Sequence, residues 1–374
     1  MKEMYEKDLY ELVSTVENSF VKKAKEKGKP IVGYTCLATP REIFDAAGIF
    51  PYRLKGFSQP NTEMADAYLS RFNCGFCRAC LQLGLDGSYD FLDGLVETNG
   101  CDHLRGMFEN WQYAAPRNFF HYVRVPHLRD EDSMEWFMEE MELLIQALQE
   151  HFGVSVDEDS LKEAIERQER IAEKLKEIYT SRWEKNIKVS GSEIMALTVA
   201  EGSLMPEDYE KLLDDFGADM EKRSPLDYRA RIFMGGAATD EVELITELED
   251  LGGIMVADSF CFGGRLFRGE VSSTEPIRKL AEMYMYNLLC PRMYMDYQYR
   301  RDFIMEMIRN SGAEAAVFFH NKFCDIHGIE NVQLRNDLEK EGIPVLHLEK
   351  EYGAQADIGR LKTRVQALME RLKR

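Results

Sequence analysis

The sequence predicts an α/β protein in which two domains with short parallel sheets are joined by a helical segment. Short apolar stretches alternate with helical stretches near both ends of the chain. Between them, Glu, Lys, Met and Leu recur at helical spacing without a strand pattern. We therefore expect an N-terminal α/β domain at 1–130, a helical segment at 131–225 and a C-terminal α/β domain at 226–374.

The N-terminal part contains a strand–helix–strand unit. The apolar stretch 31–34 predicts a strand, and a helix begins at Pro40, where the missing N–H costs no hydrogen bond. Thr39 is placed to cap this helix, and Glu42 lies in its first turn, where the helix dipole favours a carboxylate. A second strand follows at 49–54, which implies parallel pairing through a right-handed crossover.

The other elements follow from the same patterns. We expect an amphipathic helix at 3–27, a short helix at 63–69, a helical hairpin at 132–179 and further helices over 191–221. The remaining strands are expected at 91–97, 121–125, 231–234, 254–258, 315–320 and 345–349.

Composition limits the functions that this chain can have. The net charge is −19 and the basic residues form no cluster, so nucleic acid is not expected as a partner. The opening residues are charged, and no apolar run is long enough to span a membrane, so a cytoplasmic protein is expected. In a reducing compartment, eight cysteines indicate metal binding or catalysis rather than disulfides.

The cysteines are grouped. Cys74, Cys77 and Cys80 are three residues apart, and Cys101 follows the next expected strand. Thiolates at this spacing can meet around one soft metal centre, either a four-iron cluster or structural zinc, although free cysteines that only pack remain an alternative. Four cysteines follow apolar strands, at the edge where open α/β sheets bind ligands. These are Cys36, Cys101, Cys261 and Cys324.

Several stretches are specific as a set because of their order and spacing. They are 40–51 (PREIFDAAGIFP), 91–96 (FLDGLV), Cys101-Asp102, 258–261 (DSFC), Cys290-Pro291, 322–325 (KFCD) and 361–370 (LKTRVQALME). In this order they resemble the 2-hydroxyacyl-CoA dehydratase and benzoyl-CoA reductase family, which includes the D-component of 2-hydroxyglutaryl-CoA dehydratase. The resemblance runs nearly from end to end of the chain.

The resemblance implies two Rossmann-like or flavodoxin-like domains around a low-potential iron–sulfur centre. It also implies that Cys80, Cys101 and Cys324 are the protein ligands of a [4Fe-4S] cluster whose fourth iron position is open or takes a non-protein ligand. Cys74 and Cys77 crowd the first of these ligands, which leaves open which of the three binds iron. Cys261 and Cys290 resemble positions in the benzoyl-CoA reductase-like and double-cubane branches of the family. The double-cubane [8Fe-9S] cluster is held by six cysteines.

By this resemblance the protein is an iron–sulfur subunit that takes a low-potential electron from an ATP-driven activator. It would use that electron in radical dehydration or reduction of an acyl-CoA, as a lyase or an oxidoreductase of anaerobic metabolism. A homologous second subunit or a second copy of the chain would complete the enzyme. The alternative within the family is a double-cubane reductase that acts on small molecules or transfers electrons. Further alternatives are structural zinc and a non-catalytic subunit, and the acyl group and reaction direction stay open.

Few other residues are candidates for catalysis. His103, His320 and His327 lie beside cysteine-containing loops and are candidates for proton transfer, although histidine is as often a structural hydrogen-bond donor. Glu42 opens a helix that faces the expected cleft, but helix capping alone explains its position.

Three other features concern the same cleft. Arg265 either binds an anionic group or pairs with Asp258. The pair Gly235-Gly236 either receives a phosphate or CoA moiety or forms a tight turn. Cys36, in the first half, is expected near the site, and loss of iron in Cys36→Ser would make it a ligand.

Overall fold

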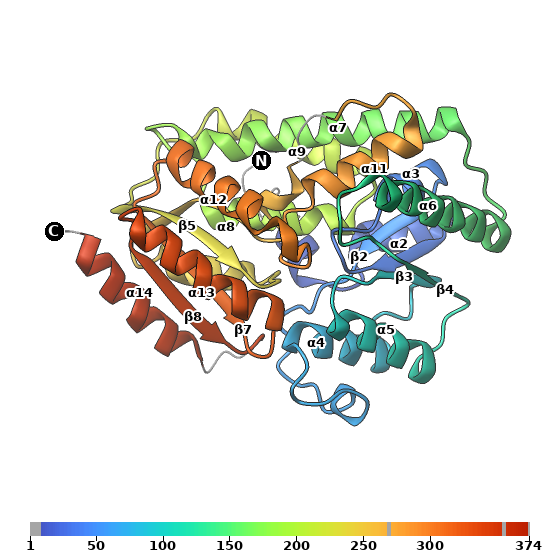
Figure 1. The fold of residues 1–374 in the computed structure, drawn as a ribbon, viewed down its shortest axis with the longest axis horizontal. Coiled ribbons are helices and arrows are strands. Elements are labelled where there is room, and N and C mark those ends of the chain that lie inside the picture. Colours follow the sequence, from blue (N-terminus) through green and yellow to red (C-terminus); the bar gives the residue numbers. More distant parts are fainter. Residues whose placement is uncertain (1–8, 268–270, 354–356, 373–374) are drawn as a thin grey trace.

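The computed structural model describes residues 9–267, 271–353 and 357–372. Two four-stranded sheets, one in each half of the chain, form the framework (Figure 1). Neighbouring strands pair in parallel in both sheets. The first sheet has the order β2 (Phe50–Arg53), β1 (Ile31–Tyr34), β3 (Gly94–Thr98) and β4 (Phe119–Val123). The second has the order β6 (Gly253–Asp258), β5 (Ala230–Gly236), β7 (Ala315–Asn321) and β8 (Val345–Lys350).

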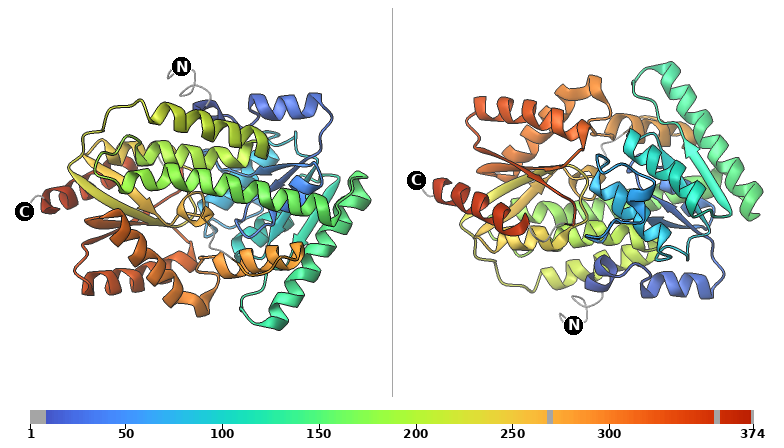
Figure 2. Two further views of the ribbon diagram at one scale, coloured as in Figure 1. Left: turned by 90° about the horizontal axis from the view of Figure 1, so that it is seen from above. Right: turned by 90° about the horizontal axis from the view of Figure 1, so that it is seen from below.

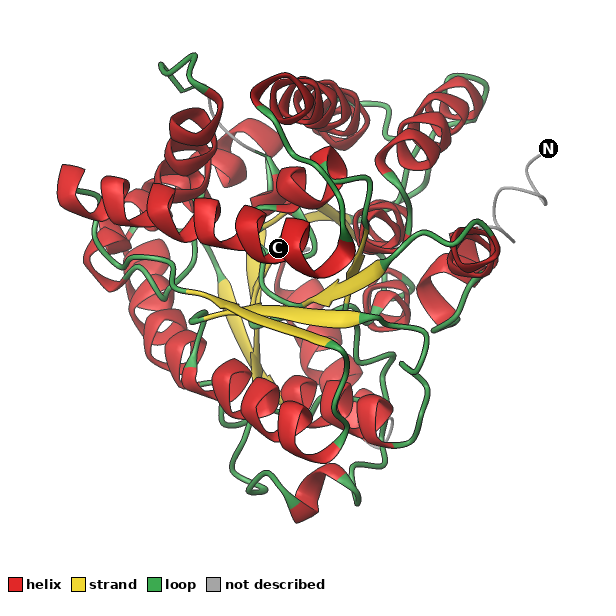
Figure 3. Ribbon diagram, turned by 90° about the vertical axis from the view of Figure 1, so that its right-hand side faces the viewer, coloured by secondary structure: helices red, strands yellow, loops and turns green. Residues whose placement is uncertain are grey.

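The predicted α/β class with two Rossmann-like units is therefore confirmed. Both sheets follow the same rule, in which the first strand lies between the second and the third. Helices cover both faces of the sheets (Figure 3), as parallel sheets require because both faces are apolar. Each expected strand is present, with bounds shifted by up to three residues.

The helices of the first half differ from expectation at three places. A single helix over 3–27 is wrong within the described residues, because residues 9–14 are helical but residues 15–18 are not. The Asn18 side chain then caps α2 (Ser19–Glu26) by accepting hydrogen bonds from two backbone N–H groups. Residues 3–8 of that expected helix lie outside the described residues. The short helix expected at 63–69 is only the 3-10 turn η1 (Ala65–Ala67).

The cap predicted for the helix after β1 is also wrong. Helix α3 (Arg41–Ala46) has Pro40 at the N-cap position and no side-chain capping bond. The Thr39 hydroxyl is buried and finds no hydrogen-bond partner among the described residues. Two further helices complete this half, α4 (Gly75–Leu85) and α5 (Asp102–Ala114).

The middle of the chain forms the expected hairpin of long helices. These are α6 (Glu131–Phe152) and α7 (Glu158–Thr180), separated by Gly153, which adopts φ +67. Helix α7 packs on α3 of the first half, and Tyr179 near its end donates a hydrogen bond to Asp258 of the second half. Figures 1 and 2 show α7 and its neighbour α9 running across both halves. The hairpin therefore fixes the two sheets relative to each other.

The remaining helices are α8 (Gly191–Ala200), α9 (Pro206–Met220), α10 (Val242–Glu249), α11 (Pro276–Asn287), α12 (Tyr297–Ser311), α13 (Asp325–Lys340) and α14 (Ile358–Leu372). Helix α11 packs against α6 and α7, so the chain of the second half returns to the first. In the described part of the chain, no helix has the length and apolar character that crossing a membrane requires.

Candidate functional site

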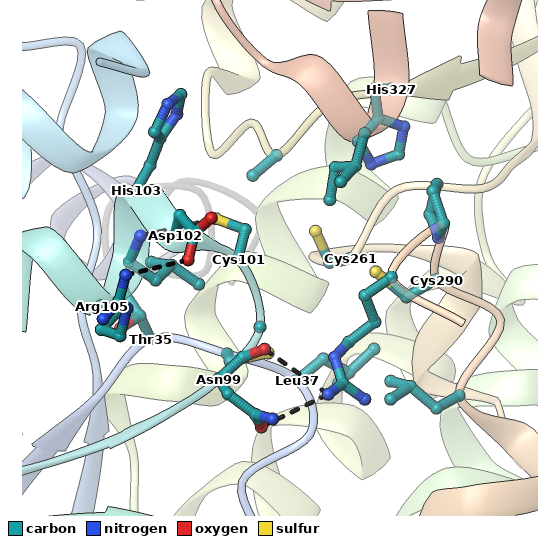
Figure 4. Close-up of a pocket in the computed structure, with 18 of the residues that line it drawn as sticks. Thr35, Leu37, Asn99, Cys101, Asp102, His103, Arg105, Cys261, Cys290 and His327 are labelled. Carbon is teal, nitrogen blue, oxygen red and sulfur yellow. Dashed lines mark hydrogen bonds and ion pairs between the residues drawn. The ribbon is translucent and has the colours of Figure 1, made fainter. Parts of the chain in front are cut away.

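A cavity of about 860 Å³ lies where the carboxyl ends of both sheets meet, and cysteines line it from both halves (Figure 4). In Figure 4, Cys101 lies on one wall, and Cys261 and Cys290 lie on the opposite wall. Seven of the eight cysteines of the chain contribute to the lining. They are Cys36, Cys74, Cys77, Cys101, Cys261, Cys290 and Cys324.

Equivalent strands deliver two of these thiols. Cys101 follows β3 and is the N-cap residue of α5, and Cys324 follows β7 and is the N-cap residue of α13. The backbone N–H of Leu104 donates to Cys101 Sγ at 3.4 Å. A thiolate at a helix N-terminus is stabilised by the helix dipole, so both positions suit metal ligation.

Cys36 reaches the cavity from the loop after β1. Its Sγ accepts a hydrogen bond from the Ala38 N–H at 3.4 Å. Gly100 allows this position, because a Cβ there would lie 2.9 Å from Cys36 Sγ. The missing side chain at residue 100 therefore lets the loops after β1 and β3 approach each other.

The three cysteines at the start of α4 differ in whether they line the cavity. Cys74 is the N-cap residue and Cys77 lies in the first turn, and both line the cavity. Cys80 is fully buried one turn further on and is not among the lining residues. It belongs to the same apolar cluster as Tyr52 and Tyr89. That Cys80 binds iron therefore stays a prediction from the resemblance, and the cavity favours its two neighbours.

The thiols of the triplet interact electrostatically. A hydrogen bond with Cys77 holds the pKa of Cys74 well below its ordinary value, and His103 acts in the same direction. The same bond raises the pKa of Cys77, and burial adds to that rise. The Cys74 N–H donates to His103 Nδ1 at 3.1 Å, and the bond to the Cys74 thiol raises the pKa of His103. Cys74 is therefore the most acidic thiol of this group.

Burial dominates at the other thiols. It raises the pKa of Cys36 to about 11 and also raises the pKa of Cys101 and of Cys324 above the ordinary value of a thiol. Such thiols are protonated in the absence of a metal and release protons when they bind one.

The cysteines of the lining are the residue type that binds soft metal centres. Within the described ranges, no three His, Cys, Asp or Glu side chains are placed to hold one metal ion. A tetrahedral zinc with bonds of about 2.3 Å requires thiolates roughly 3.8 Å apart. An iron–sulfur cluster is larger and accepts more widely spaced thiolates, and soft thiolates are its usual ligands. Seven cysteines line the cavity, so ligands of this type are present there.

Three arginines that line the cavity are buried. Arg53 donates to the carbonyl oxygens of Thr35 and Cys261, and its guanidinium lies over the Phe262 ring. Arg292 donates mainly to backbone carbonyls, including that of Pro126 at 3.0 Å. Sequence reasoning missed both, since neither Arg53 at the end of β2 nor Arg292 in the segment after α11 belongs to a distinguishing pattern.

The third arginine is Arg265, and it does not pair with Asp258. The carboxylate of Asp258 accepts hydrogen bonds from the N–H groups of Phe260 and Gly264 and from the Tyr179 hydroxyl. No hydrogen bond or ion pair joins the Arg265 side chain to a residue within the described ranges.

The other candidates are scattered. His103 and His327 line the cavity, whereas His320 does not, and its Nε2 lies 3.2 Å from the Cys324 carbonyl oxygen. Glu42 is buried in a separate cavity of about 570 Å³, where it accepts a hydrogen bond from the Tyr284 hydroxyl at 2.7 Å. Glu42 is therefore removed from the cysteines.

Two features near the sheet ends complete the site. Gly235 and Gly236 are the last two residues of β5, so the tight turn expected for this pair is wrong. Gly236 has φ +121 and pairs with Phe319 of β7 so closely that a Cβ would lie 1.9 Å from the Phe319 oxygen. Glu97, at the end of β3, was not anticipated. Burial raises its pKa to about 8. Its only sequence signal is a single carboxylate in an apolar strand.

The fold and the cavity define a two-sheet α/β protein with a cysteine-lined centre between its halves. The model of the 2-hydroxyglutaryl-CoA dehydratase D-component family matches residues 36–372, and the chain belongs to this family.

Named relatives support the same assignment. The chain is 27% identical to the (R)-phenyllactyl-CoA dehydratase beta subunit of Clostridium sporogenes, over 98% of both chains. It is 24% identical to one of the benzoyl-CoA reductase subunits of Thauera aromatica, over 87% of this chain and 86% of the relative. It is 21% identical to the (R)-2-hydroxyglutaryl-CoA dehydratase beta subunit of Acidaminococcus fermentans, over 97% and 98%. These relatives are subunits of a lyase or an oxidoreductase, the two enzyme classes that the resemblance implied.

Proposed function

We propose that the chain is an iron–sulfur subunit of an enzyme that dehydrates or reduces an acyl-CoA by radical chemistry. The observation that carries this proposal is the convergence of cysteines from both sheets on one cavity. The relatives named as acyl-CoA dehydratase and benzoyl-CoA reductase subunits support the substrate class.

Cys101 and Cys324 are the proposed ligands from the two halves, and Cys74 or Cys77 is the third ligand that the cavity favours over Cys80. When bound, the cluster supplies an electron of low potential. The N–H groups of Ala38 and Leu104 donate to cavity sulfurs, and such bonds tune a cluster. His103 lines the cavity and has a raised pKa, so it is the proposed donor of a proton to the substrate.

The proposal includes partners that the chain itself does not supply. An ATP-dependent iron–sulfur activator would deliver the electron, because the sequence has no phosphate-binding loop of the Gly-x4-Gly-Lys-Ser/Thr type. A homologous subunit or a second copy would complete the enzyme, as the subunit names of the relatives suggest. The expected compartment is the cytoplasm.

Iron and acid-labile sulfide, measured per chain on anaerobically purified protein, test this proposal. About four irons per chain support a single cubane. A fully folded protein without iron would remove the proposed function and return the cysteines to zinc or to packing.

A second candidate is a double-cubane reductase that acts on small molecules or passes electrons. The specific observation in its favour is that seven cysteines line the cavity, enough for the six that such a cluster needs. About eight irons per chain would favour it. Addition of an acyl-CoA separates the two functions further, because only the acyl-CoA enzyme should respond with a spectral change or a thermal shift. An equimolar mixture of free acid and CoA is the control.

A further inference from the structure

Arg265 is a buried cation without a partner in the described structure. It lies in the 3-10 turn η4 (Gly264–Leu266), four residues after Cys261, and its side chain lines the cysteine cavity. Only 5% of the residue is exposed. Its Nη1 is inaccessible to solvent and has no hydrogen-bond partner, and no ion pair joins the guanidinium to a described residue.

The nearest carboxylate in sequence does not neutralise this charge. Asp258 accepts three hydrogen bonds, from the Gly264 N–H at 2.7 Å, the Phe260 N–H at 3.0 Å and the Tyr179 hydroxyl at 3.0 Å. These bonds hold the turn that carries Arg265, so Asp258 shapes the loop and leaves the guanidinium to another group.

The rest of the buried wall does not supply an anion either. Arg53 and Arg292 are 2% and 4% exposed, and the oxygens to which they donate hydrogen bonds are carbonyl oxygens. The carboxylates that line the cavity, Asp102 and Asp325, are both exposed. The interior of the cavity therefore combines buried positive charge with carboxylates that lie only toward solvent.

A buried, unpaired guanidinium is costly, because the lost hydration is not replaced. Cys261 has the thiol nearest in sequence to Arg265, and Arg53 already lies beside this residue. The Nη1 of Arg53 donates a hydrogen bond to the Cys261 carbonyl oxygen at 3.0 Å. Both arginines lower the pKa of Cys261, against burial that raises it. A second cation is therefore more than one thiol requires.

We propose that Arg265 binds an anionic group of the substrate, a carboxylate or another compact oxyanion, inside the cysteine cavity. The planar guanidinium presents paired N–H donors that match two oxygens of such a group. Arg53 and Arg292 add positive potential to the same pocket. The inference rests on the proposed function in one respect, that the reaction takes place in this cavity. It adds that the acyl group or small substrate carries an acidic group.

The test uses propionate and its neutral isostere propionamide, because the two differ in charge and little in shape. Their dissociation constants are measured by calorimetry on anaerobically purified protein, for the wild type and the Arg265→Gln and Arg265→Lys variants. Arg301→Gln is the matched control, since Arg301 is partly exposed and pairs with the exposed Asp302. We expect Arg265→Gln to weaken propionate binding at least tenfold, Arg265→Lys to weaken it less, and Arg301→Gln to leave it unchanged. Propionamide binding should be weak and equal in all four proteins.

Inorganic phosphate, measured in the same way, distinguishes the source of the oxyanion. Tighter binding of phosphate than of propionate, with the same dependence on Arg265, identifies a phosphate group as the ligand; the reverse order identifies a carboxylate. Equal propionate affinity in the wild type and Arg265→Gln overturns the proposal.

A second measurement keeps the test independent of folding and of the cluster. Arg265→Met should melt at a higher temperature than the wild type in anion-free buffer, because it removes an unpaired buried charge. Propionate should then raise the melting temperature of the wild type alone. Loss of iron in Arg265→Gln with unchanged propionate affinity would assign Arg265 to the cluster and overturn the inference. A wild type without iron would instead contradict the proposed function and leave the propionate comparison intact.

Discussion

The two halves of the molecule have the same sheet order but contribute different groups to the cavity. In both, the third strand is followed by a cysteine at the N-cap of the next helix, Cys101 after β3 and Cys324 after β7. The repeated topology thus places one thiol from each half in the lining of one cavity. A parallel sheet directs its carboxyl ends to one edge, so two such sheets that face each other form a shared site.

The halves differ at the ends of the other strands. The first strand of the N-terminal half is followed by Cys36, whereas its counterpart β5 ends in Gly236. The N-terminal half also adds thiols from α4, and the C-terminal half adds Arg265 and Arg292. Equivalent strands therefore fix where a residue enters the site, and each half supplies different chemistry at those positions.

The largest effect is expected when the repeated cysteines are replaced. Cys101→Ser and Cys324→Ser should each lose most of the iron, because each half supplies one ligand from its third strand. Cys80→Ala should keep the iron, since Cys80 lies outside the lining of the cavity. Iron content and visible absorbance of the anaerobically purified variants measure this.

Cys77→Ser is the informative comparison for the triplet. Loss of iron in Cys77→Ser with retention in Cys80→Ala would support the cavity, whereas the opposite pattern would restore the ligand that the resemblance implies. Intact absorbance in both third-strand variants contradicts the shared site altogether.

The next largest effect is expected at Gly236, where the C-terminal half has no cysteine. Alanine there must adopt φ +121 and would place its Cβ 1.9 Å from the Phe319 oxygen. We expect a loss of about 2–4 kcal/mol in the free energy of unfolding. Chemical denaturation measures it.

Gly217→Ala is the matched control, because a Cβ at this position in α9 meets no atom within 4 Å. This substitution should stabilise the protein by about 0.5–1 kcal/mol. A loss at Gly236 no larger than the change at Gly217 would contradict the tight approach of β5 to β7.

The fold was predictable from sequence because period and turn signals are local. Parallel sheets are buried on both faces, so their strands appear as short apolar runs, and each was expected within three residues. The break before Asn18 was not anticipated, because apolar spacing continues across it while the side chain of Asn18 forms a cap. The Thr39 cap failed for the opposite reason, since a suitable residue type was present but its hydroxyl was not used.

The site was predictable only in part. Strand ends identified Cys36, Cys101, Cys261 and Cys324 as neighbours of one edge, because topology determines those positions. The rotation of α4 determines which residue of the triplet faces the cavity, and the sequence does not show it. Glu97 and the buried arginines were missed because burial and the lack of a partner are tertiary properties.

Glu97 lies near the end of β3, and its titration should make the free energy of unfolding depend on pH. Burial raises its pKa from 4.5 to about 8. Between these two values the folded protein holds a proton that the unfolded chain releases, so the free energy of unfolding should fall as pH rises through this window. The fall should amount to roughly 2–4 kcal/mol.

Glu97→Gln removes this titration and should flatten the profile, leaving the variant more stable than the wild type near pH 8. Denaturant midpoints at intervals between pH 5 and pH 8, with Glu370→Gln as an exposed control, measure the difference. Parallel profiles of wild type and Glu97→Gln would show that this carboxyl is not responsible.

The smallest effect concerns the contact that joins the halves at the edge of the site. Phe72 and Phe323 form an edge-to-face pair with ring centroids 5.3 Å apart, two residues before Cys74 and one before Cys324. The two residues are 73% and 37% exposed, so burial contributes little and the pair itself dominates. A double-mutant cycle of Phe72→Ala and Phe323→Ala should give a coupling energy of about 0.5–1.5 kcal/mol.

The matched pair lies within one half. Tyr68 and Tyr113 form a similar contact, with centroids 6.4 Å apart, that involves only the N-terminal half. If the halves are held at the cavity edge by the phenylalanine pair, Phe72→Ala should also speed the reaction of the cavity thiols with a bulky alkylating reagent, and Tyr113→Ala should not. Additive losses in the phenylalanine cycle, with unchanged thiol reactivity, would leave the long helix α7 as the element that fixes the two sheets, since it contacts both.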